Sequence, residues 1–122
     1  MGGDRRESER IFFSRKNGLK AAFTLPDAQE EIFSATLMDL SLKGLGLSFK
    51  KGEYEIDIGD RMRVTEIRNK AELKDIADTA VEIRWMRCYD ALNHILFGCE
   101  FLDISDAARE QIQDFIRSWA DQ

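Results

Sequence analysis

The chain has 122 residues, which suits one compact domain, and its 43% hydrophobic and 34% charged residues give the balance of a folded globular protein. Its net charge of −5 opposes nonspecific binding of a nucleic-acid polymer, which requires clustered Lys and Arg. Because no apolar run approaches the roughly 20 residues of a membrane span and the N-terminus resembles no secretion signal, we expect a cytoplasmic protein without membrane insertion.

The first twelve residues predict a flexible, basic arm. Residues 1–20 carry six basic and three acidic side chains, so the rest of the chain has a net charge of −8. The opening residues also show no hydrophobic period. We therefore divide the chain into an arm (1–12) and a single folded domain (13–122).

Six segments of strand character follow the arm, supported by alternation of apolar and polar residues. The alternation is clearest where Leu45, Leu47 and Phe49 share one face. Six antiparallel strands in one domain predict a β-barrel, and a short helical turn is expected within residues 69–78. The predicted strands are 19–25, 32–38, 45–49, 61–67, 79–87 and 95–102.

An amphipathic helix is predicted after the last strand. Ser105 can cap its first turn, where Asp106 complements the helix dipole. We expect this helix to close one end of the barrel through a single apolar stripe, formed by Ala108, Ile112, Phe115, Ile116 and Trp119.

The chain offers little catalytic chemistry. His94 is its only histidine, in a predicted loop with no serine elbow or cysteine nucleophile nearby, and no Gly-rich nucleotide loop is present. Cys88 and Cys99 form no Cys-x-x-Cys pair, so two buried, reduced thiols are expected. We predict no enzyme activity, no metal site and no cofactor; a cryptic carboxylate pair is the one catalytic alternative that an acidic chain leaves open.

Two motifs stand out against this background. The arm contains Arg6-Glu-Ser-Glu-Arg10, a spacing that eleven arginines produce about once by chance. The second predicted strand ends in Asp39-Leu-Ser-Leu-Lys-Gly44, which chance produces only about once in twenty-five chains of this composition. The alternative for the second motif is a tight turn, in which Asp and Ser bond their own backbone and Gly takes a positive φ.

In this order, followed by strands and a helix, the two motifs resemble the PilZ family, whose signature is Arg-x-x-x-Arg followed by Asp/Asn-x-Ser-x-x-Gly. The resemblance spans residues 5–119 and includes Ile95-Leu-Phe-Gly-Cys-Glu-Phe101, which is similar to the family's late strand. It implies a mainly β fold, a six-stranded antiparallel barrel with a C-terminal helix, and recognition of cyclic di-GMP. It also implies a receptor that controls motility, exopolysaccharide or biofilm formation through an unnamed protein partner.

The chemistry of cyclic di-GMP suits the residues of both motifs. The guanidinium forks of Arg6 and Arg10 match its phosphates and the O6 and N7 acceptors of guanine, although Glu7 and Glu9 oppose a phosphate. Asp39 supplies an acceptor for the guanine N–H groups, and Ser41 adds a hydroxyl. Gly44 would let the turn bend and the ligand approach.

Arg5 and Trp85 are further candidates. Arg5 extends the arginine pair and would hold a second, stacked copy of the ligand, as an extra arginine does in similar domains. Trp85 offers a stacking surface, but because it alternates with Val81 and Ile83 we predict that it packs in the core.

Two other functions stay open beside the receptor. A barrel of this family that binds only protein is the first, and the intact motifs weigh against it. A barrel that binds RNA or single-stranded DNA is the second, and it would need aromatic and basic residues together on one face, which the acidic body does not offer.

Overall fold

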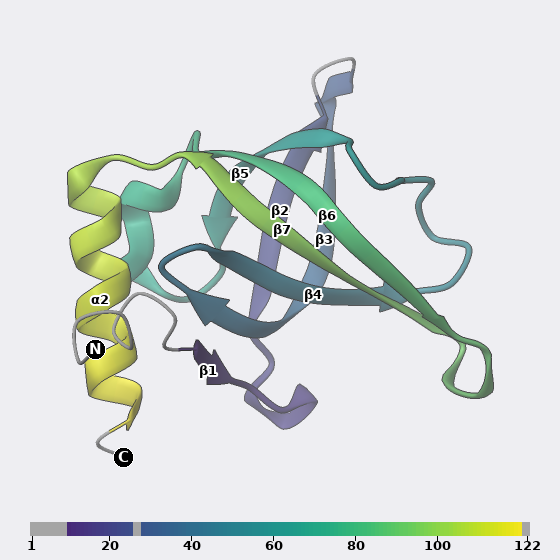
Figure 1. The fold of residues 1–122 in the computed structure, drawn as a ribbon, viewed down its shortest axis with the longest axis horizontal. Coiled ribbons are helices and arrows are strands. Elements are labelled where there is room, and N and C mark those ends of the chain that lie inside the picture. The colour runs from purple at the N-terminus through teal and green to yellow at the C-terminus, as the bar shows by residue number, and fades with distance from the viewer. Residues whose placement is uncertain (1–9, 26–27, 121–122) are drawn as a thin grey trace.

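The structure is a computed structural model that describes residues 10–25 and 28–120. These residues form seven strands, three short 3-10 helices and one α-helix (Figure 1). The strands are β1 (Arg10–Phe12), β2 (Lys20–Leu25), β3 (Ala28–Ser41), β4 (Gly44–Lys50), β5 (Arg61–Ile67), β6 (Ala80–Tyr89) and β7 (His94–Asp103). The helices are η1 (Arg15–Asn17), η2 (Ala71–Ile76), η3 (Asp90–Leu92) and α2 (Asp106–Ala120).

Six of the strands close into an antiparallel barrel in the order β3-β2-β5-β6-β7-β4. Closure occurs because β3 pairs with β2 along one edge and with β4 along the other. The predicted six-stranded barrel with a C-terminal helix is thus confirmed (Figure 1). β3 is longer than predicted at both ends, since its partners continue to supply backbone hydrogen bonds as far as Ser41.

The seventh strand, β1, comes from residues that the sequence placed in the arm. It pairs with the end of β3 on the same edge as β2, beyond the last residue that pairs with β2. Arg10 lies opposite Ser41 and Phe12 lies opposite Asp39. The expected arm is therefore wrong for residues 10–12, because the unpaired end of β3 offers them a partner. Residues 1–9 lie outside the described part of the chain.

The barrel interior contains the apolar faces that alternation predicted. Leu45, Leu47 and Phe49 of β4 point into the core, with exposed fractions of 2%, 0% and 3%. They pack with residues of the neighbouring strands, including Ile83 and Phe97. Each such side chain contributes roughly 1.5–3 kcal/mol through burial, so these contacts stabilise the barrel.

The C-terminal helix α2 packs beside the barrel, against η2 and β1 (Figure 1). The Ser105 hydroxyl accepts a hydrogen bond of 3.1 Å from the Ala108 N–H, which confirms the predicted cap. The ring of Phe13, just after β1, packs on Phe115 and Trp119 of the helix. Within the described residues, no helix is long and apolar enough to cross a membrane.

Two predictions about β6 are wrong. The register of β6 on β7 shifts between Ile83 and Trp85, so one extra residue reverses the alternation and turns Trp85 outward, with 39% of its surface exposed. Cys88 is exposed rather than buried, because it lies near the tip of the β6–β7 hairpin, which extends past the barrel (Figure 1). Cys99 is buried as expected, and burial raises its pKa to about 12.

Truncation of Leu47 to alanine should lower the free energy of unfolding by about 2–5 kcal/mol, because the side chain is fully buried and the cavity cannot collapse completely. Urea denaturation would measure the loss. Leu92→Ala is the matched control, since Leu92 is 63% exposed and should change stability by less than about 0.5 kcal/mol. Equal effects of the two substitutions would contradict the assigned core.

Candidate functional site

Four residues on four adjacent strands form one row across the outer face of the barrel. Asp39 of β3 lies opposite Gly46 of β4, Gly46 lies opposite Gly98 of β7, and Gly98 lies opposite Trp85 of β6. The row therefore has two glycines in the middle, with a carboxylate at one end and an indole at the other.

The two glycines are required by the side chains beside them. A Cβ on Gly46 would collide with the Asp39 carboxylate, and a Cβ on Gly98 would collide with the Trp85 indole. The carboxylate thus covers the backbone of Gly46, and the indole covers that of Gly98. Both glycines are therefore buried, and a molecule at this face would contact the carboxylate and the indole that cover them.

This row lies in a surface hollow of about 170 Å³. Its walls carry charges of both signs from β1, the β3–β4 turn, β6 and β7. Residues that line the hollow are Arg10, Asp39, Lys43, Gly44, Leu45, Gly46, Arg84, Trp85, Gly98, Cys99 and Glu100.

Arg10 and Asp39 meet at the β1 side of the hollow. The Arg10 Nε atom lies 3.6 Å from Asp39 Oδ1, and their side chains are 47% and 14% exposed. This distance marks an ion pair rather than a close hydrogen bond, so the guanidinium keeps donors for another acceptor.

Asp39 is held in an environment that disfavours its charge. Burial raises the pKa of this carboxyl, and the Arg10 charge and the Gly46 backbone N–H only partly offset that effect. A desolvated carboxylate of this kind gains from additional N–H donors. Asp39 is therefore suited to accept hydrogen bonds from a ligand.

Ser41 is buried and does not line the hollow. Its hydroxyl oxygen accepts hydrogen bonds from the backbone N–H groups of Lys43 (3.1 Å) and Gly44 (3.3 Å), and the residue is 1% exposed. Ser41 therefore holds the β3–β4 turn, as the turn alternative predicted for the serine.

Gly44 serves a different purpose from the one that the turn alternative predicted. It is not among the glycines with positive φ. Instead, a Cβ on Gly44 would collide with the backbone carbonyl of Cys99 on β7. Its role is therefore the close approach of β4 and β7, which brings the row of four residues together.

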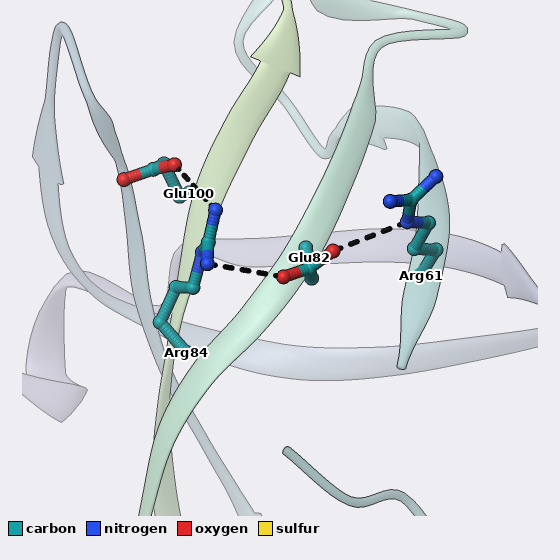
Figure 2. Close-up of polar contacts among 4 residues, drawn as sticks. All are labelled: Arg61, Glu82, Arg84 and Glu100. Atoms are coloured by element: carbon teal, nitrogen blue, oxygen red, sulfur yellow. Dashed lines mark hydrogen bonds and ion pairs between the residues drawn. The ribbon is translucent and has the colours of Figure 1, made fainter. Parts of the chain in front are cut away.

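Charged residues on the opposite rim form a network (Figure 2). Arg84 contacts Glu82 on its own strand at 3.2 Å and Glu100 on β7 at 2.8 Å. Arg61 of β5 contacts the other oxygen of Glu82 at 3.1 Å. Two carboxylates and two guanidinium groups thus alternate from β5 to β7.

The structure brings together Arg10, Asp39 and Gly44 of the predicted site residues around the hollow, and the buried Ser41 hydroxyl accepts a hydrogen bond from the Gly44 N–H. Arg5 and Arg6 lie outside the described residues. Sequence reasoning did not assign Gly46 or Arg84 to the site. Gly46 had a signal, because a glycine faces outward between Leu45 and Leu47, but only the register shows that it pairs with Gly98.

Several solved structures have a similar fold. The PilZ domain of Escherichia coli YcgR with c-di-GMP matches with a TM-score of 0.68 at 19% identity, over 93% of this chain and 89% of that one. The Bacillus subtilis inhibitor of motility, MotI, matches with a TM-score of 0.70 at 14% identity, over 93% of this chain and 50% of MotI. Borreliella burgdorferi PlzA in complex with c-di-GMP matches with a TM-score of 0.58 at 13% identity, over 98% of this chain and 55% of PlzA.

These likenesses are likenesses of fold, and the chain spans about half the length of MotI and of PlzA. No curated protein matches the chain in sequence. A family model for the PilZ domain matches residues 4–118, which is nearly the whole chain. The sequence match and the barrel agree, and the chain belongs to the PilZ-domain family.

Proposed function

We propose that this protein binds cyclic di-GMP in the hollow and acts as a receptor or adaptor without catalytic activity. The observation that carries the proposal is the meeting of the Arg10 guanidinium and the Asp39 carboxylate in one surface hollow with the Trp85 indole. Cyclic di-GMP needs both kinds of group, since it presents anionic phosphates and guanine edges with donors and acceptors. The similar YcgR and PlzA structures contain this ligand, which supports the choice.

Each residue has a distinct role in this proposal. The Arg10 fork binds a phosphate or the O6 and N7 atoms of guanine, and Asp39 accepts hydrogen bonds from the guanine N–H groups. Ser41 and Gly44 act indirectly, by holding the turn and the close β4–β7 approach. Trp85 offers its exposed indole as a stacking surface for a base.

The small size of the hollow supports a role for the arm in this proposal. Its volume of about 170 Å³ is below the roughly 300–1,000 Å³ of pockets that enclose a whole small molecule. The hollow therefore holds part of the ligand, and the rest needs further contacts. We assign these to Arg6, and to Arg5 with a second, stacked copy of the ligand.

In this mechanism the ligand fixes residues 1–9 against the barrel and so creates a new surface for a protein partner in the bacterial cytoplasm. Motility is the process that the likeness to the inhibitor MotI favours. Control of exopolysaccharide or biofilm formation belongs to the same proposal.

Replacement of Arg10 by alanine should weaken binding of cyclic di-GMP about 10- to 150-fold, the loss expected for a charge-assisted hydrogen bond. Calorimetric titration at a fixed salt concentration measures this, with GTP as a control ligand. Arg109→Ala is the matched control variant, because Arg109 is exposed on α2 and does not line the hollow. If the parent protein shows neither heat nor a shift in melting temperature at high ligand, the receptor function is wrong and the protein-interaction alternative takes its place.

The role of Arg5 is tested by stoichiometry. Titration of the parent protein should give two ligands per chain, and Arg5→Ala should give one, because the variant lacks the fork that holds the second copy. One ligand per chain in both proteins would rule out this role while leaving the receptor function intact.

The ionised Asp39 side chain should lower the free energy of unfolding of the ligand-free protein. Because the folded protein raises the pKa of this carboxyl above 3.8, the ionised form is disfavoured by folding, and the associated stability is lost as pH rises through the folded pKa. Asp39→Asn should therefore be more stable than the parent at pH 7 in urea denaturation without ligand. This advantage should disappear below about pH 3.8, where the carboxyl is protonated in both states. A variant that is less stable at pH 7 would contradict the assignment.

A further inference from the structure

Two glutamates face each other directly across β6 and β7 at the rim of the hollow. Glu82 is the register partner of Glu100, and like charges in this position destabilise a strand pair. Both lie one row away from the pair of Trp85 and Gly98 on the outer face. A cation between these carboxylates is therefore needed at this point of the sheet.

Arg84 supplies that cation from an unusual backbone position. It is the extra residue of the β6 bulge, because Ile83 pairs with Cys99 and Trp85 pairs with the next residue, Gly98. Its two terminal nitrogens contact the two carboxylates separately, at 3.2 Å to Glu82 and 2.8 Å to Glu100 (Figure 2). One guanidinium thus ties the bulge to its own strand and to β7.

Further contacts make the network more than a pair of surface charges. Arg61 of β5 forms a second ion pair with Glu82, whose side chain is only 16% exposed (Figure 2). Isolated exposed ion pairs contribute little, whereas a planar fork in a network with a half-buried carboxylate has a defined geometry. The position of Arg84 is therefore constrained from three strands.

The bulge decides the direction of the Trp85 side chain. In regular alternation Val81, Ile83 and Trp85 would share the inner face, but the extra residue places the indole outside, over Gly98. The Arg87 guanidinium lies 5.9 Å from the centre of the Trp85 ring. Arg87 follows Trp85 in the sequence, whereas the bulge residue Arg84 precedes it. The indole is thus placed by the backbone at Arg84.

We propose that Arg84 is a positioning residue that, clamped by Glu82 and Glu100, holds the β6 bulge and thereby keeps Trp85 in the hollow as a binding surface for a planar base. This inference rests on the proposed function for its ligand. It assigns Arg84 no contact with that ligand, and its effect passes through Trp85.

The first test reports on Trp85 without ligand. In a Trp119→Phe background, Trp85 is the only tryptophan, so its fluorescence reports its surroundings alone. Arg84→Ala should shift the emission to longer wavelength and increase quenching by acrylamide, with an unchanged far-ultraviolet circular dichroism spectrum. Arg84→Lys should give a smaller change in the same direction, because one ammonium group cannot fork to both carboxylates. Arg109→Ala should give none; unchanged Trp85 fluorescence in Arg84→Ala would overturn the proposal.

The second test separates positioning from direct contact. Arg84→Ala and Trp85→Ala should each weaken cyclic di-GMP binding about 5- to 150-fold, the range for one lost stacking contact. The double variant should bind about as weakly as Trp85→Ala alone, since Arg84 acts through Trp85. Additive losses would mean that Arg84 contacts the ligand itself, which overturns the positioning role. If the parent protein binds no cyclic di-GMP, the proposed function fails, and the fluorescence test still decides the clamp.

Discussion

The pairing of β3 along both of its edges is the constraint on which the rest of the molecule depends. One edge takes β2 and then β1, and the other edge takes β4, so this strand closes the barrel. The same pairing brings Arg10 from the start of the described chain to Asp39 in its middle. The pairing that closes the barrel therefore also brings the residues of the candidate site together, because those residues include the end of β3.

On the outer face of the barrel, two glycines make room for the side chains of neighbouring strands. Gly46 and Gly98 are paired at the centre of the face, and the groups that lean over them come from the flanking strands. This arrangement leaves a carboxylate partly desolvated, as the raised pKa of Asp39 records. Burial of a carboxylate without full hydrogen-bonding compensation is unfavourable, so added N–H donors would stabilise its charged form.

The anchoring of β1 links this face to the helix. Phe13 follows β1 directly and packs against Phe115 and Trp119 of α2, while its backbone N–H bonds to Met38 on β3. Arg10 is three residues from that anchor. The helix therefore holds one end of the chain segment that carries the arginine.

The amino-acid sequence by itself determined six of the seven described strands, the capped helix and the family, because alternation, capping and motif spacing are local properties of the chain. It also singled out Arg10, Asp39, Ser41 and Gly44. It could not show that the Ser41 hydroxyl bonds the β3–β4 turn while Asp39 lines the hollow. Both residues lie at the end of the same strand and differ only in their tertiary partners.

Only the tertiary structure decided the direction of Trp85, the pairing of the two glycines and the clamp at Arg84. Inward and outward side chains alternate regularly before the bulge and again after it, but the residues after the bulge point to the opposite face from the one that continued alternation predicts. The position of the bulge is set by the register with β7. The register depends on the closure of the whole barrel. Residues far apart in the chain therefore decide which side chains meet on its outer face.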